Sequence, residues 1–158
     1  MKENILDILT FLFDNYYIGD SKMPSSVSNF ELEMCSLGFS KNQALAAVGW
    51  LHTLRYMRSK SSLSNVSSSL ATRVYTEAEK QKICVKARAL LQDLENKSIL
   101  DVKTREIIVD MVLATGADSI SYSDFLRVIG IIVYNQSSFP REILMAMELV
   151  DNNDILPN

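Results

Sequence analysis

Residues 121–135 read SYSDFLRVIGIIVYN, and this stretch decides the fold. From Phe125 to Asn135 it carries a single charge, at Arg127, and its apolar residues fall on every side of a helical period. A helix that is apolar all round is buried on all sides. Ser121 with Asp124 provides a capping box at its start, so we predict the central buried helix here.

Two segments upstream show similar start signals. Thr76 with Glu79 forms a capping box, and Asp101 can cap a helix that Gly116 closes. We expect the helix that starts at Thr76 to continue without a break through its apolar stripe. That stripe consists of Ile83, Ala87, Leu90, Leu91 and Leu94.

The N-terminal third has the spacing of three more helices, over 2–16, 27–37 and from about 40 to 58. Gly38 can take the left-handed conformation that ends a helix, and Ser40 with Gln43 can begin the next one. A glycine stop followed by an aromatic residue and a capped helix is typical of a simple helical hairpin, so we expect the rings of Phe39 and Trp50 in the core.

The remaining segments have weaker secondary-structure signals. TRVY at 72–75 and the pair Ile120 and Tyr122 have the alternation of very short strands, whereas the serine-rich 58–69 is typical of a loop. Pro140 suits the first turn of a last helix. The sequence therefore predicts a mainly α protein, a single-domain bundle of about six helices at 1–150 with at most one tiny two-stranded β element, and a frayed tail at 151–158.

The composition is that of a globular protein in a reducing compartment. The 158 residues are 47% hydrophobic and 22% charged. The only two cysteines, Cys35 and Cys84, are too few and too far apart for a disulfide framework, so we expect buried, reduced thiols and a cytoplasmic location. The longest apolar run, 128–134, is far below the ~20 residues of a membrane span. We therefore expect no membrane partner.

No pattern points to catalysis. His52 is the only histidine, which excludes sites that need two imidazoles, and the glycines are too widely spaced for a phosphate-binding loop. We therefore expect no enzyme activity, no metal and no cofactor.

The charge is unevenly distributed. Residues 1–54 carry three basic and six acidic side chains, 55–105 carry eleven and five, and 106–158 carry two and eight. The basic middle either binds an anionic partner or pairs internally with the acidic ends. Lys82 and Lys86 lie one turn apart in the helix predicted after Thr76. The candidate interaction residues are Arg73, Lys82, Lys86, Lys103, Thr104 and Arg105.

Four stretches together resemble the Smg family of small bacterial proteins, whose molecular function is undefined. The stretches are LGFSKNQALAAVGWLHTL, TRVYTEAEKQ, LDVKTREIIVDMVLA and FLRVIGIIVYN. The chain departs from the family pattern at Val128, where we expect tryptophan, and in its serine-rich loop. The resemblance implies a cytoplasmic protein and supplies no active site. Arg73, Thr104 and Arg105 match the family and are explained by neither core nor caps, so we expect them to be exposed polar contacts.

Two functions remain open from the sequence. The first is a non-catalytic cytoplasmic helical adaptor that binds another protein, favoured by the lack of a catalytic constellation and by the acidic C-terminal third. The alternative is a nucleic-acid-associated protein that uses the basic segment 55–105.

Overall fold

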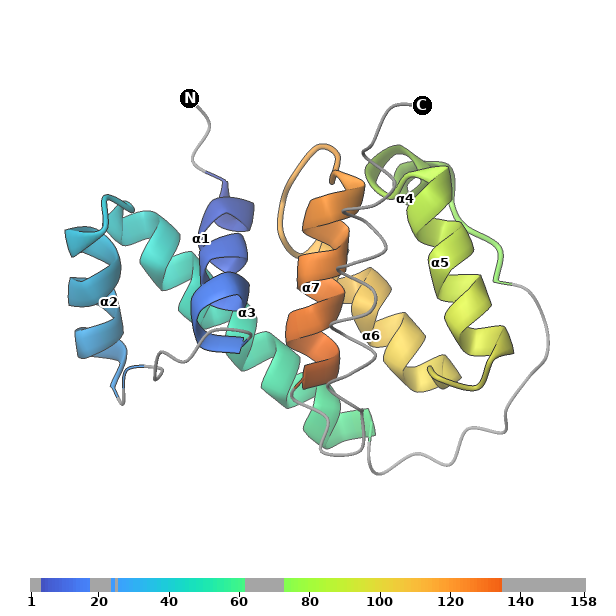
Figure 1. Cartoon of the computed structure of the whole chain (residues 1–158), viewed down its shortest axis with the longest axis horizontal. Helices are drawn as coiled ribbons and strands as arrows, with labels where there is room; N and C mark the ends of the chain where they lie inside the picture. The colour runs from blue at the N-terminus through green and yellow to red at the C-terminus, as the bar shows by residue number, and fades with distance from the viewer. Residues whose placement is uncertain (1–3, 18–23, 25, 62–72, 135–158) are drawn as a thin grey trace.

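The computed structural model describes residues 4–17, 24, 26–61 and 73–134. Within these ranges the chain forms seven α-helices and one π-helical turn, which confirms the predicted all-α class (Figure 1). The elements are α1 (Ile5–Leu12), η1 (Phe13–Tyr17), α2 (Val27–Ser36), α3 (Lys41–Ser61), α4 (Glu77–Lys82), α5 (Val85–Asn96), α6 (Val102–Leu113) and α7 (Tyr122–Tyr134).

Helix α7 is the centre of the core, as its all-round apolar sequence predicts. From Val128 to Val133 its apolar side chains are at most 1% exposed. Figure 1 shows α7 between α1 on one side and α5 and α6 on the other. The ring of Phe13, in η1, lies directly on the Cα of Gly130, where a Cβ would overlap it. The missing side chain at position 130 therefore lets η1 approach the central helix closely.

The predicted start and stop signals between α2 and α3 are confirmed. Gly38 has φ +99° after the end of α2. The Ser40 hydroxyl accepts a hydrogen bond from the backbone N–H of Gln43, whose side-chain oxygen accepts one from the Ser40 N–H. Phe39, in the connection, packs its ring edge-on against Phe11 of α1.

The helix predicted to continue from Thr76 is in fact broken. Thr76 and Glu79 form their capping box, but α4 ends at Lys82, and Ile83 is extended at φ −111° and ψ 111°. Ile83 makes an isolated parallel bridge to Ile120, whose N–H donates to the Lys82 carbonyl at 3.0 Å. The Ile83 side chain is fully buried in this position. The bridge and this burial therefore outweigh the helical preference of the segment.

Other sequence expectations also need correction. Among the described residues the Ile83–Ile120 bridge is the only β pairing, and it does not involve TRVY. The α-helical part of the predicted helix 2–16 ends at Leu12 and continues as the π-helical turn η1 to Tyr17. Helix α3 continues to Ser61 and so includes the first four residues of the serine-rich stretch. The predicted last helix after Pro140, the frayed tail and the rest of the serine-rich stretch lie outside the described residues.

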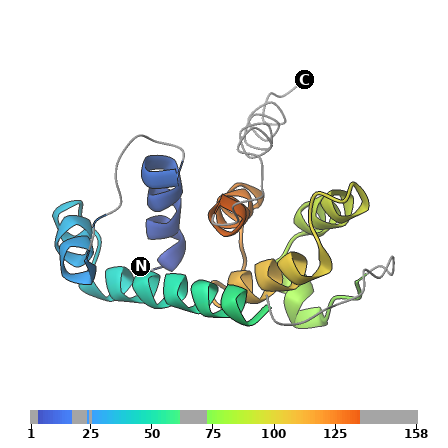
Figure 2. The ribbon, with the colours of Figure 1, turned by 90° about the horizontal axis from the view of Figure 1, so that it is seen from below.

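Helix α3 is the longest described element and lies at the edge of the molecule. In Figure 2 it runs along the lower side of the left half, with α1 and α7 on its inner side and no described element below it. Its inner face buries Ala44, Ala47, Trp50 and Leu54. The opposite face of α3 is therefore left to solvent in the described part of the chain.

Candidate functional site

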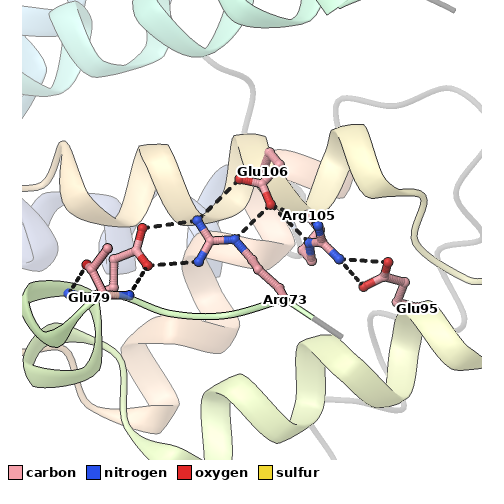
Figure 3. A network of polar contacts seen from close by, with 6 residues as sticks. Arg73, Glu79, Glu95, Arg105 and Glu106 are labelled. Carbon is pink, nitrogen blue, oxygen red and sulfur yellow. Dashed lines mark hydrogen bonds and ion pairs between the residues drawn. The ribbon is translucent and has the colours of Figure 1, made fainter. Parts of the chain in front are cut away.

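Two of the predicted interaction residues, Arg73 and Arg105, lie in one network of charged side chains (Figure 3). Arg73 donates to the Glu79 carboxylate at 2.8 and 3.0 Å and to the Glu106 carboxylate at 2.7 and 3.3 Å. Arg105 donates to both oxygens of Glu95 at 2.7 Å and to Glu106 at 3.0 and 3.1 Å. The network joins the segment before α4 to α5 and α6.

The pKa shifts in the network show that its charges stabilise one another. Hydrogen bonds from Arg73 lower the pKa of Glu79 to about 2, and those to Glu79 raise the pKa of Arg73. Burial alone would raise the pKa of Glu106, but hydrogen bonds from both arginines outweigh it and lower this pKa. Burial likewise disfavours the charged form of Arg105, and its carboxylate partners reverse the effect, so its pKa is raised. The ionised forms of Arg73, Glu79, Arg105 and Glu106 are therefore favoured by their partners in the network.

This environment corrects the expectation that Thr104 and Arg105 are exposed. Thr104 is 4% and Arg105 8% exposed. The backbone N–H of Thr104 donates to Asp101, the predicted cap of α6, at 2.7 Å. The face of α6 that carries these two residues therefore packs inside the protein. The buried charge of Arg105 is compensated there by its ion pairs with Glu95 and Glu106.

The hydrogen bonds described above for this network join arginines to glutamates, and the three candidate lysines have other surroundings. Lys82 and Lys86 do not share a helix, because the chain breaks at Ile83 between them. The Lys86 ammonium lies 4.2 Å from the centre of the Tyr122 ring, a cation–π contact, and Lys103 is half-buried at the start of α6. Of the six candidate residues, Arg73 and Arg105 are thus paired with carboxylates, and Lys82 and Lys86 lie on separate helices.

The two cysteines and the histidine are all exposed in the described part of the chain. Cys35 and Cys84 are exposed, whereas the sequence analysis expected buried thiols. His52 is exposed on α3. No group of three metal-ligating side chains occurs within the described ranges.

The outer face of α3 was not predicted from the sequence as an interaction surface. We define its outer stripe as Leu45, Gly49, His52 and Tyr56; single apolar side chains on other helices, Leu32 at 70% and Val85 at 72%, are more exposed. Leu45 is 44% and Tyr56 64% exposed. Positions spaced by four, seven and eleven residues lie on one helix face. The helical spacing of these residues is visible in the sequence. The apolar residues on the buried face of α3 have the same spacing, and only they were assigned a role.

Two hollows flank this outer stripe. One, of about 250 Å³, lies between α2 and α3 and has a mixed lining. Its apolar residues are Pro24, Val27, Phe30, Val48 and Leu51, and its polar residues are Ser26, His52 and Arg55. The other, of about 360 Å³, lies between α3, the start of α1 and the end of α6. Its lining mixes apolar and neutral polar groups: Ile5, Asn42, Gln43, Ala46, Trp50, Thr53, Ala114 and Thr115.

The described part of the chain is a small all-α fold. Ion pairs between charged side chains link its helices, and its longest helix, α3, exposes Leu45 and Tyr56. No helix among the described residues has the length and hydropathy required to cross a bilayer. A family model described as protein of unknown function (DUF494) matches residues 5–156, so the chain belongs to the DUF494 family.

Curated relatives give the same assignment under the name Protein Smg homolog. The protein from Thioalkalivibrio sulfidiphilus is 30% identical over 86% of this chain and 85% of its own length. The protein from Methylococcus capsulatus is 29% identical, over 87% and 86% of the two chains, and that from Stenotrophomonas maltophilia is 31% identical, over 86% and 85%. No solved structure matches the chain. The resemblance to the Smg family seen in the sequence is thus confirmed.

Proposed function

We propose that this protein is a non-catalytic cytoplasmic adaptor that docks another protein on the outer stripe of α3. The observation that carries the proposal is the exposure of Leu45 and Tyr56 on a face covered by no other described element. Tyrosine is enriched among the residues that carry most of the binding energy at protein interfaces, and the hollows beside the stripe offer concave surface for side chains of a partner.

The charged network supports a structural role for Arg73 and Arg105, two of the candidate interaction residues. Both guanidinium groups already donate to carboxylates through all their nitrogens. Using them to hold a ligand would require these ion pairs to break. The network therefore serves to fix α4, α5 and α6 relative to one another, which leaves α3 as the favoured interaction element.

The proposal is tested by affinity capture from a nuclease-treated lysate of the organism that encodes the chain. The bait is the full chain, compared with a Leu45→Glu, Tyr56→Glu variant and with a Val74→Glu control, since Val74 is 88% exposed and lies before α4. We expect a protein that the wild type and the control retain and the double variant loses. Capture that is equal for all three baits would contradict the proposal.

A further inference from the structure

Gly49 lies in the middle of α3, where the described fold gives no reason for a glycine. Glycine weakens a helix interior because it gives up more backbone freedom than alanine. A Cβ built at position 49 would meet no atom within 4 Å, in contrast to Gly130, which is covered by the Phe13 ring. The absence of a side chain at Gly49 therefore leaves the backbone of α3 accessible at the protein surface and does not serve packing inside the protein.

That room lies at the middle of the outer stripe. Leu45 precedes Gly49 by four residues, and His52 and Tyr56 follow it by three and seven, so all four positions share one face of the helix. Small residues at a helix surface allow the backbone of a second helix to approach closely, with larger side chains packing on either side. Gly49 therefore has the position of a crossing point between two helices.

The charges of α3 decide which second helix fits. Between Lys41 and Ser61 the helix carries four basic residues and no acidic residue. Of these, Arg55 and Lys60 are exposed and, from their helical spacing, lie on opposite sides of the stripe. A second copy of this chain would bring basic residues against basic residues, whereas an acidic helix would be complementary.

We propose that the partner segment docked on α3 is an amphipathic helix from another protein, apolar on one face and acidic along its edges, which crosses α3 at Gly49. Leu45 and Tyr56 pack against its apolar face, and Arg55 and Lys60 pair with its acidic edges. A large apolar side chain of the partner enters the hollow lined by Phe30, on the α2 side. This inference rests on the proposed function and specifies the chemistry of the partner.

The test is selection of binders to the full chain from a displayed library of random peptides of about 16 residues, long enough for about four helical turns. We expect enrichment of sequences with apolar residues at helical spacing and a net negative charge. Synthesised binders should gain helical circular dichroism on mixing with the protein. In anisotropy titrations Gly49→Gln should weaken them at least about tenfold, the loss typical of a disrupted interface centre.

Matched variants separate the possible outcomes. Val74→Gln is the control for a glutamine introduced at an exposed position outside α3, and it should leave peptide binding unchanged. Arg55→Glu with Lys60→Glu should weaken acidic binders and not uncharged ones. Enriched peptides that are basic or extended, or whose binding is unchanged by Gly49→Gln, would overturn the inference, as would a library that yields no binder.

Two other occupants of the stripe are distinguished directly. A concentration-dependent dimer in sedimentation equilibrium that Gly49→Gln abolishes would assign the stripe to a second copy. A crosslink to residues 135–158 of the same chain, from p-benzoylphenylalanine in place of Thr53, would assign it to the chain itself. If lysate capture depends on Leu45 and Tyr56 while selected peptides are not acidic helices, the partner chemistry is wrong and the adaptor function stands.

Discussion

The indole Nε1 of Trp50 donates a hydrogen bond to the backbone carbonyl of Met111 at 2.9 Å, which joins α3 to α6 across 61 residues of sequence. Met111 lies in the last turn of α6, where carbonyl groups have no partner within the helix. Trp50 is only 4% exposed, so one side chain both fills the core and satisfies a helix end.

Trp50 should therefore be among the residues most sensitive to substitution. We expect Trp50→Ala to lower the free energy of unfolding by roughly 3 to 5 kcal/mol, the cost of truncating a buried aromatic residue. Trp50→Phe retains most of the apolar volume but leaves the Met111 carbonyl without its donor, at about 1 to 3 kcal/mol. Urea unfolding followed by circular dichroism measures both changes. A loss below about 1 kcal/mol for Trp50→Ala would show that the ring is not part of the core.

The same residue shows how far the sequence could predict the structure. The hairpin pattern around Gly38 correctly predicted that Trp50 is a core residue, although the apolar stripe assigned to this helix from its periodicity did not include it. It could not identify Met111 as the partner, since that contact depends on how two distant helices pack. The core of α7 was predictable for the opposite reason: a helix that is apolar all round has no other place to lie.

Internal pairing of the basic middle was one of the two alternatives open from the sequence, but the individual partners in the charged network could not be predicted. The capping box accounted for Glu79 without reference to Arg73, although Glu79 makes both interactions. The break before α5 was hidden because Ile83 and Ala87 keep helical spacing across it and both are buried. In each case a tertiary contact, to Glu106 or to Ile120, adds to what the local pattern specifies.

Gly49 and Gly130 provide a matched pair of glycine substitutions with opposite expected effects. We expect Gly130→Ala to lower the free energy of unfolding by about 1 to 3 kcal/mol, because the added Cβ overlaps the Phe13 ring in a packed core. Gly49→Ala should raise it by about 0.5 to 1 kcal/mol, the intrinsic helix preference of alanine, since nothing surrounds the added atom. Urea midpoints that shift in the same direction for both variants would contradict this account.

Glu79 should make stability depend on acid pH. Its pKa falls from 4.5 to about 2 in the folded protein because of Arg73, so the contribution is fully present above about pH 5 and is lost as the pH falls towards 2. Its side chain is 13% exposed, and after allowance for solvent screening we expect a loss of roughly 1 to 3 kcal/mol over this range. Denaturant unfolding at several pH values should show a weaker dependence for Glu79→Gln than for the wild type. The control Glu77→Gln, at a side chain that is 86% exposed, should behave like the wild type.

The nucleic-acid alternative makes a prediction about salt. Arg73 and Arg105 donate to three carboxylates, and Lys82 and Lys86 lie on separate helices, so we expect no salt-sensitive binding of duplex DNA by the segment 55–105. If about four phosphates were neutralised, the slope of log affinity against log salt would be about −3.6, and a fourfold rise in salt would weaken binding roughly 100-fold. Anisotropy of a labelled duplex between about 50 and 200 mM salt measures this slope. A slope of that size, abolished by Lys82→Glu with Lys86→Glu but retained with Lys41→Glu, a charge reversal on α3 outside the segment, would show that the basic segment binds nucleic acid.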